Sequence, residues 1–309
     1  MIISKKLDTV SIRLIVRILL TLFTAVTLVS CSGSSDDKVL PTDENSGGAQ
    51  IDSAAITIFT VIGDVPYTIE QKEGLVNLID AHNAKSKSEF VVHVGDIKPG
   101  GDVCDESVYE EVSGLLRKFE SPTFIILGDN EFNDCDNPED GLALWKTYFL
   151  NFNTNWNFPY VVENQEERPE NFAWVENRVL FLGLNLVGSS VHDQMEWDNR
   201  LADDAEWIEQ QFELQKDNIE VAVLFGHANM TELNPEKFEP FTNRFRKASV
   251  VLDKPVLYMQ GDGHFWFENK PWPEQNIVRV QIEGGANAVQ VTVNPNLENP
   301  FNFDREFLN

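Results

Sequence analysis

The chain has 309 residues, 42% of them hydrophobic, and it carries 24 Lys and Arg against 50 Asp and Glu, a formal net charge of −26. This apolar content is enough for a full core and excludes a disordered or collagen-like chain. The length allows one large domain or two small ones. A surface this negative repels phosphate backbones, so we expect no nucleic-acid partner.

The first 30 residues have the organisation of an export signal. Four basic residues precede an apolar run, ILLTLFTAVTLV at residues 18–29, which is too short to span a bilayer but typical of a signal peptide. The run ends in Leu-Val-Ser-Cys, which resembles the lipobox of bacterial lipoproteins. In such proteins the cysteine, here Cys31, becomes the lipidated first residue. An ordinary signal peptide with an incidental cysteine is the alternative.

The lipobox resemblance implies a lipid-anchored protein of the bacterial cell envelope, facing the periplasm or the exterior. Residues 31–53 are polar and rich in Gly, Ser and Asp, so we expect a flexible tether. We therefore divide the chain into a signal peptide (1–30), a tether (31–53), a folded domain (54–295) and a C-terminal tail (296–309).

Five short apolar runs organise the folded domain, and glycine follows each of them. They span residues 56–62, 90–94, 123–127, 221–225 and 255–260. Near-continuous runs rich in β-branched and aromatic residues are typical of strands buried on both faces. Ligands of α/β sheets collect beyond the carboxyl ends of the strands. The sequence therefore brings four aspartates and two histidines to one sheet edge: Asp64, Asp96, Asp129, His227, Asp262 and His264.

The segments between these runs predict helices and further strands. Residues 69–84, 105–119 and 198–216 have the apolar spacing of amphipathic helices. A strand pair is expected at 172–174 and 179–186, and a hairpin at 277–282 and 288–293. Antiparallel strands combined with alternating helices predict an α/β fold of two packed sheets with helices outside.

Two cysteines remain after Cys31. Cys104 and Cys135 follow the second and third predicted strands, so both lie on loops leaving the same sheet edge. Because export allows oxidation, we predict a disulfide that braces the two loops. Two free buried thiols are the alternative.

The clustered carboxylates indicate bound cations. A single Asp after a strand is usually a helix cap or a turn former, but here the pattern repeats at one edge. Carboxylates gathered there would repel one another unless cations lay between them. Two divalent ions would nearly neutralise four carboxylates, and such a pair can clamp a phosphoryl group and activate water.

The order Asp, Gly-Asp, Gly-x-x-Glu, Gly-His and Gly-x-x-His resembles the calcineurin-like metallophosphoesterases over residues 56–293, in a form similar to an atypical exported lipoprotein branch. The resemblance implies a four-layer α/β sandwich of two mixed β-sheets flanked by helices, with 54–295 as the catalytic domain. It also implies a dinuclear metal centre that hydrolyses phosphomono- or diesters with a metal-bound hydroxide. The implied ligands are Asp96 as the bridge, Asp64 and His264 on the first metal, and Asp129, His227 and Asp262 on the second.

Departures from the family pattern fall at three motifs. Pro66 stands where the family has a metal-binding His, and Tyr67 is either its replacement or a packed tyrosine. Asn130 stands where the family has a proton-donating His. The carboxylate of Asp262 replaces an imidazole. This gives the site more hard oxygen ligands, which favour Mn²⁺ or Mg²⁺, with Fe or Zn²⁺ possible.

Several residues are candidates for the remaining roles. We assign catalytic positions to Asn130, Glu131 and His192, with Asp134 a further candidate for the missing proton donor and His192 alternatively a surface histidine. Lys98 either contacts a substrate phosphate or is solvated.

Three functions remain open from the sequence. The chain is a metal-dependent hydrolase of a small phosphoester, or a degenerate relative that binds metal or a phosphorylated ligand without turnover. The third alternative is a calcium-binding envelope scaffold, which would explain the acidity but not the two histidines at strand ends.

Overall fold

The computed structural model describes residues 56–232 and 234–309. The predicted signal peptide (1–30), the tether (31–53) and the lipidated Cys31 lie outside the described residues. Within the described part, no helix combines the length and the apolar character needed to cross a membrane.

Twelve strands, five α-helices and two short 3-10 helices make up the described part. The strands are β1 (Thr57–Ile62), β2 (Phe90–His93), β3 (Thr123–Ile125), β4 (Glu163–Asn164), β5 (Phe172–Glu176), β6 (Val179–Gly183), β7 (Val221–Phe225), β8 (Val256–Gln260), β9 (Phe267–Asn269), β10 (Ile277–Gln281), β11 (Val289–Val293) and β12 (Phe301–Asp304). The helices are α1 (Ile69–Lys85), α2 (Glu106–Leu116), α3 (Pro138–Phe149), η1 (Phe152–Asn155), α4 (Gln194–Gln215), η2 (Pro235–Phe238) and α5 (Glu239–Leu252).

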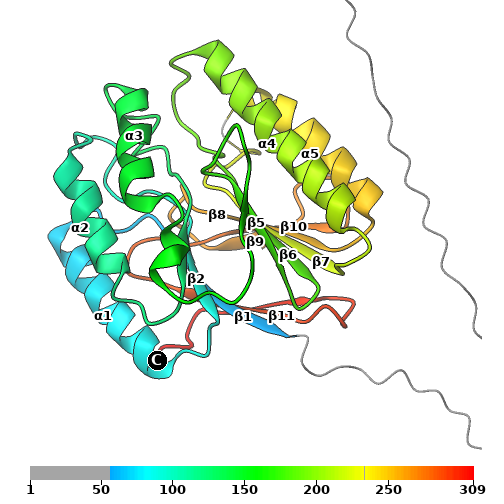
Figure 1. The fold of residues 1–309 in the computed structure, drawn as a ribbon, viewed down its shortest axis with the longest axis horizontal. Helices are drawn as coiled ribbons and strands as arrows, with labels where there is room; N and C mark the ends of the chain where they lie inside the picture. Colours follow the sequence, from blue (N-terminus) through cyan, green and yellow to red (C-terminus); the bar gives the residue numbers. More distant parts are fainter. Residues whose placement is uncertain (1–55, 233) are drawn as a thin grey trace, which may run out of the picture. The chain divides into compact units, whose positions relative to one another are not determined.

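The strands form two mixed sheets (Figure 1). One sheet has the order β12-β11-β1-β2-β3, and the other β4-β5-β6-β7-β8-β10-β9. Strands β1, β2 and β3 are parallel, as are β6, β7, β8 and β10, whereas the flanking strands run antiparallel. The predicted α/β fold with two mixed sheets is confirmed.

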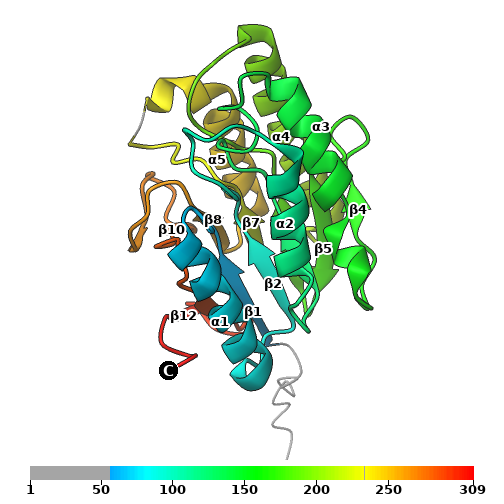
Figure 2. The same cartoon turned by 90° about the vertical axis from the view of Figure 1, so that its left-hand side faces the viewer.

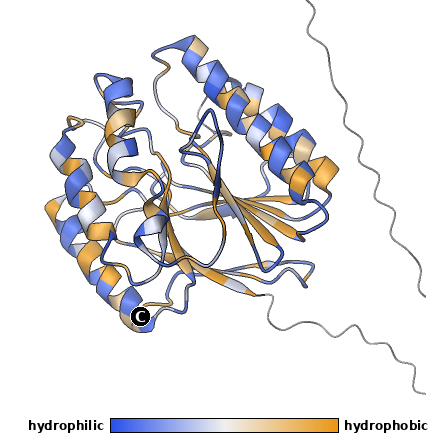
Figure 3. Cartoon of the chain, viewed as in Figure 1, coloured by the Kyte–Doolittle hydropathy of each residue, from blue (hydrophilic) through white to orange (hydrophobic). Residues whose placement is uncertain are grey.

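Helices cover the outer faces of both sheets, which makes four layers (Figure 1), and Figure 2 shows α1 and α2 in front of β1 and β2. Helices α1, α2 and α3 pack on the five-stranded sheet, and α4 and α5 pack on the seven-stranded one. An aromatic core that includes Phe59, Phe90 and Phe181 fills the space between the sheets. The hydropathy colouring shows mainly apolar strands and helices along which polar and apolar residues alternate (Figure 3).

Each of the five glycine-terminated runs forms a strand, β1, β2, β3, β7 and β8, as predicted. The three predicted helices also form, and side-chain caps set where they begin. Thr68 caps α1 and Asp105 caps α2. Asp193 caps α4 by accepting hydrogen bonds from the next helical N–H groups, so this helix begins at Gln194 rather than at the predicted residue 198.

The hairpin expected around Gly284 and Gly285 is wrong. Strand β10 pairs with β8 in the seven-stranded sheet, whereas β11 pairs with β1 in the other sheet. The two glycines, both with positive φ, carry the chain from one sheet to the other, and Gly285 donates its N–H to the carbonyl of Asp64. The crossing gives β1 an antiparallel neighbour and brings the loop against the turn after β1.

Helices α3 and α5, strands β4, β9 and β12, and both 3-10 helices lie where the sequence predicted no element. Strand β12 lies within the segment expected to be a tail and extends the five-stranded sheet next to β11. Helix α5 buries Phe241, Phe245 and Leu252 against the seven-stranded sheet.

Candidate metal centre

The turns after five strands meet at the carboxyl ends of the two sheets and bring the predicted ligands together. Two groups of side chains offer ligand atoms that lie within 4.8 Å of one another. One group is Asp64, Asp96 and His264, and the other is Asp96, Asp129 and His227. Asp96 belongs to both, as expected for a carboxylate shared by two metals.

Asp262 lies beside these groups without belonging to either. A Cβ added to Gly188 would lie 3.6 Å from both Asp129 Oδ1 and Asp262 Oδ2, so the two carboxylates flank the same small space. The Asp262 backbone N–H donates to Asp64 Oδ1 at 2.8 Å. Burial raises the pKa of the Asp262 carboxyl, and the nearby charge of His227 opposes the rise.

The backbone is strained where the ligands project. Asp64, Asp96, Asp262 and His264 all have positive φ, between 53° and 70°, a region that side-chain-bearing residues avoid at a cost of about 1–3 kcal/mol each. Four of the ten non-glycine residues with positive φ in the described part are therefore predicted ligands. Such strain persists only where the surroundings enforce it, and it is concentrated at functional sites.

Glycine is required where two of these turns touch. A Cβ on Gly128 would lie 2.1 Å from the backbone nitrogen of Asp96. No side chain fits there, so Gly128 lets the turns after β2 and β3 approach closely. The approach places Asp96 and Asp129 in one group.

His227 is oriented to coordinate through its Nε2. Its Nδ1 lies 2.7 Å from the carbonyl oxygen of Val94 and donates to it, which directs Nε2 toward Asp96 Oδ1 at 3.3 Å and Asp129 Oδ1 at 3.1 Å. A histidine that donates one nitrogen to a carbonyl and presents the other is the usual arrangement of a metal ligand. Burial alone would lower the pKa of His227, but the two carboxylates more than offset it and raise the pKa well above its usual value.

Three buried ligand atoms lack a well-aligned hydrogen bond: Asp64 Oδ2, and the pair Asp129 Oδ1 and His227 Nε2, which face each other at 3.1 Å. Leaving such atoms buried and unpaired costs about 1–3 kcal/mol each, more where they are charged. Cations between them would remove this cost. The donor set, mostly carboxylate oxygen with two imidazoles, therefore fits divalent metal ions.

Asn130 and Glu131 lie in the turn after β3 and contact the backbone and carboxylate of Asp96. Asn130 donates its side-chain N–H to Asp96 Oδ2 at 2.6 Å and to the Lys98 carbonyl at 2.9 Å. Glu131 accepts backbone N–H groups from Gly128, Asp96 and Ile97. Burial, together with the charge of Asp96, raises the pKa of Glu131 to about 8. Both side chains hold the turns together.

His192 is not brought to the metal ligands. It is exposed on the loop before α4 and lines a cavity of about 280 Å³, with Asn133, Arg168 and Trp197 among its other walls. Lys98 is buried and donates to the carbonyls of Pro99 and Asp102. The interpretation of Lys98 as a solvated residue is therefore wrong, since its ammonium group braces its own loop.

Tyr67 contacts the shared carboxylate directly. Its hydroxyl donates to Asp96 Oδ2 at 2.5 Å, and its ring lies edge-on to that of His264, with 5.3 Å between centroids. Burial and the charges of Asp96 and Asp64 raise the pKa of Tyr67, so the group remains a phenol. Of the two interpretations of Tyr67, a residue that replaces a ligand or a packed tyrosine, neither described this hydrogen bond.

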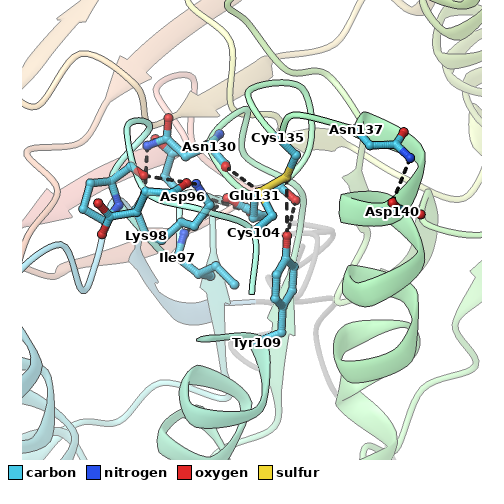
Figure 4. Close-up of a disulfide and its surroundings, with 12 residues drawn as sticks. Asp96, Ile97, Lys98, Cys104, Tyr109, Asn130, Glu131, Cys135, Asn137 and Asp140 are labelled. Carbon is cyan, nitrogen blue, oxygen red and sulfur yellow. Dashed lines mark hydrogen bonds between the residues drawn. A yellow bond between two sulfur atoms is a disulfide. The ribbon is translucent and has the colours of Figure 1, made fainter. Parts of the chain in front are cut away.

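Cys104 and Cys135 form the predicted disulfide, with 5.6 Å between their Cα atoms. It joins the loop after β2 to the loop after β3, beside Asn130 and Glu131 (Figure 4). The hydroxyl of Tyr109 donates to the Glu131 carbonyl from below the same loop. The disulfide therefore braces the two loops that carry Asp96 and Asp129.

Two residues next to the ligands were not predicted from the sequence. Gly188 follows β6 and adjoins Asp129 and Asp262, and Asn229 directs its backbone N–H toward Asp262 Oδ2 at 3.4 Å. No acidic residue follows the run that forms β6, so the repeated strand-end pattern did not mark this loop. Asn229 lies only two residues after the predicted ligand His227, and this closeness in sequence was the one indication of its place.

A family model described as calcineurin-like phosphoesterase matches residues 58–258. Among solved structures, a purple acid phosphatase from yellow lupin seeds has a TM-score of 0.52 at 12% identity, covering 77% of this chain and 49% of that one. GAP50, the anchor in the inner membrane complex of Plasmodium, has a TM-score of 0.50 at 8% identity, covering 81% and 88%. Such low identities show a shared fold alone. No curated protein matches the chain in sequence.

Proposed function

Because the chain belongs to the calcineurin-like phosphoesterase family, we propose that it is a metal-dependent hydrolase of small phosphoesters. One observation carries the proposal. Two groups of ligand atoms share the buried Asp96, and three of their buried atoms lack a well-aligned hydrogen bond. This arrangement suits two divalent cations that are held close together.

The proposed ligands are divided between the two groups. Asp64, Asp96 and His264 would hold one ion, and Asp96, Asp129 and His227 the other, with Asp262 completing the second. Such a pair of ions, when bound, polarises a phosphoryl oxygen and supplies a nucleophile from water at neutral pH. The chain's own contribution is to fix the ligands on strained turns and to keep His227 Nε2 free by binding its Nδ1 to Val94.

The ligand set favours hard cations. Four carboxylates and two imidazoles suit Mn²⁺ or Mg²⁺ better than the family's more histidine-rich set, with Fe or Zn²⁺ as possible substitutes. The strongly negative chain makes a small phosphoester a better substrate than a nucleic acid.

A second function is favoured by Pro66 and Asn130. Pro66 has no ligand atom, and Asn130 commits its amide hydrogens inside the protein, so neither residue can protonate a leaving group. Loss of general acid catalysis costs about 10²–10⁴ in rate. A relative that binds metal or a phosphorylated ligand without turnover is therefore the alternative.

Metal reloading separates the two functions. The domain is stripped with a chelator, reloaded with Mn²⁺, Mg²⁺, Zn²⁺, Fe or Ca²⁺, and assayed on nitrophenyl phosphate and bis-nitrophenyl phosphate. Turnover that depends on the added metal supports the hydrolase. Stoichiometric metal uptake without turnover on either ester supports the binding protein, and uptake of Ca²⁺ alone contradicts both.

We also propose that Cys31 anchors the chain to the bacterial envelope through a lipid, because its surroundings resemble a lipobox. Cys31→Ser should move the protein from the membrane to the soluble fraction, since the tether has no other apolar attachment. Fractionation followed by immunoblotting measures this. A variant that remains with the membrane contradicts the anchor.

A further inference from the structure

The two oxygens of Asp96 have different partners. Oδ2 accepts two short hydrogen bonds, from the Tyr67 hydroxyl at 2.5 Å and from Asn130 Nδ2 at 2.6 Å. Oδ1 accepts the Asn130 backbone N–H at 3.0 Å and lies 3.3 Å from His227 Nε2. The two oxygens of the Asp96 carboxylate are therefore not equivalent, because each has its own set of hydrogen-bond partners.

Asn130 has no donor left for another partner. One side-chain N–H is directed to Asp96 Oδ2 and the other to the Lys98 carbonyl. Its Nδ2 also lies 3.1 Å from the Tyr67 hydroxyl, so the two groups that donate to Asp96 Oδ2 lie next to each other. In the position of the family's proton donor, this residue points its amide at a metal ligand.

Tyr67 is held in place independently of Asp96. Its backbone N–H donates to Gln71 Oε1 at 2.6 Å, in the first turn of α1. The edge of its ring packs against His264. The phenol is thus fixed by α1 on one side and by the loop after β8 on the other.

An aspartate carboxylate turns easily about its last bond, because that torsion is broad and roughly two-fold. A carboxylate that serves two ligand groups must be fixed in rotation, or one of the groups loses its geometry. The group of Asp64, Asp96 and His264 can tolerate little error in the orientation of Asp96. Pro66 contributes no ligand there, so only these three side chains remain.

We propose that Tyr67 and Asn130 are positioning residues, a pair of hydrogen-bond donors that fixes the rotation of the Asp96 carboxylate for both metals. The inference rests on the proposed metal centre and assigns Asn130 a role different from the proton donor that the family has there. Hydrogen-bond partners of metal ligands typically change metal affinity 10- to 100-fold when they are removed.

The test measures metal binding in the full chain without any turnover. Tyr67→Phe should weaken Mn²⁺ binding about 10-fold or more at both sites, because Asp96 serves both, as measured by calorimetric titration of the metal-free protein. Asn130→Ala removes the other donor and should have a similar effect. The control is Tyr148→Phe, which removes a hydroxyl-to-carboxylate hydrogen bond to Glu106 of 2.9 Å on the surface and should leave Mn²⁺ affinity unchanged.

Urea unfolding of the metal-free variants identifies a loss of affinity that comes only from misfolding. If Tyr67→Phe fails to fold, Asn130→Ala decides the matter. Tyrosinate absorbance that appears in the wild type on metal binding would mean that Tyr67 is itself a ligand, which overturns the positioning role. Unchanged Mn²⁺ affinity in both variants overturns this inference alone, whereas a wild type that binds no metal overturns the proposed function as well.

Discussion

Two buried polar clusters in this protein neutralise their charge differently. The metal centre gathers Asp64, Asp96 and Asp129 with two histidines, His227 and His264. The second cluster, here called the α4 network, lies under α4 and consists of Lys146, Glu170, Asn171, Asn185, Arg200 and Asp204. Both contain buried carboxylates in the described structure.

The α4 network is balanced by the chain itself. Lys146 lies 3.1 Å from Glu170, and Arg200 is fully buried against Asn185 and Glu196. Burial raises the pKa of Asp204 to about 8, so that carboxyl group stays protonated at neutral pH. In the metal centre, no Lys or Arg within the described residues forms an ion pair with Asp64, Asp96 or Asp129. The difference separates a structural polar cluster from one that requires cations from outside.

The largest expected effect is at the shared carboxylate. Asp96→Asn keeps the shape but removes the charge, so both metals and activity should be lost together. Because metal ions contribute several kcal/mol to transition-state stabilisation, turnover should fall about 10³-fold or more. Metal analysis and assays on bis-nitrophenyl phosphate measure the two losses. Circular dichroism should show an intact fold, and a variant that keeps both metals and full turnover contradicts the dinuclear model.

The disulfide affects only one side of the comparison, since it braces the metal-binding loops and not the α4 network. Cys104 and Cys135 are 31 residues apart. Replacing both by Ser should lower the free energy of unfolding by about 3–4 kcal/mol on the chain-entropy estimate. Urea unfolding with and without a reductant checks this. An oxidised wild type no more stable than the double variant would contradict the prediction.

Breaking the α4 network should reduce stability without changing metal binding. Lys146→Met leaves the buried Glu170 without its cation, which should cost about 1–3 kcal/mol in the free energy of unfolding because Lys146 itself is partly exposed. The double variant with Glu170→Gln removes the uncompensated charge and should recover part of the loss. Mn²⁺ affinity is expected to stay at the wild-type value in both variants. A fall in affinity would show that the two clusters are coupled.

The contribution of Asp204 to stability depends on pH. The pKa of its carboxyl group is about 8 in the folded protein and about 3.9 when unfolded. The folded state then binds the extra proton, so this stability is full below pH about 4 and is lost as pH rises to about 8. Asp204→Asn should flatten this slope, which reaches at most about 1.4 kcal/mol per pH unit.

Urea unfolding of the metal-free protein at several pH values measures the slope. Asp198→Asn removes an exposed carboxylate from the same helix and should leave the slope unchanged. A slope in Asp204→Asn equal to that of the wild type would mean that Asp204 is ionised in the fold.

The sequence predicted those parts of the fold whose signal is local. A strand buried on both faces is a continuous apolar run, so β1, β2, β3, β7 and β8 were all identified, together with the ligand that follows each. Helix α5 was missed although Phe241, Phe245, Ser249 and Leu252 are spaced four, four and three residues apart along its buried face. The polar residues among them, and the buried Ser249 in particular, weaken an apolar pattern.

Strand pairing and side-chain contacts between residues far apart in the sequence could not be predicted from local patterns. Strands β10 and β11 look like a hairpin because only seven residues, 282–288, separate them, but their partners in the two sheets are β8 and β1. The hydrogen bond from Tyr67 to Asp96 spans 29 residues, and the one from Asn130 to Asp96 spans 34. Such contacts depend on how the turns meet, which no local pattern records.

The hydrogen bond between Asp262 and Asp64 joins residues 198 positions apart, and this distance has a consequence for folding. Closing so long a stretch of chain is entropically costly and has to precede the contacts that reward it. A nascent chain therefore carries Asp64, Asp96 and Asp129 long before His227 and His264 exist. The native ligand groups cannot be complete until the second sheet has formed, so metal capture belongs to the end of folding. In this protein a bound metal would report that the chain has reached its final topology.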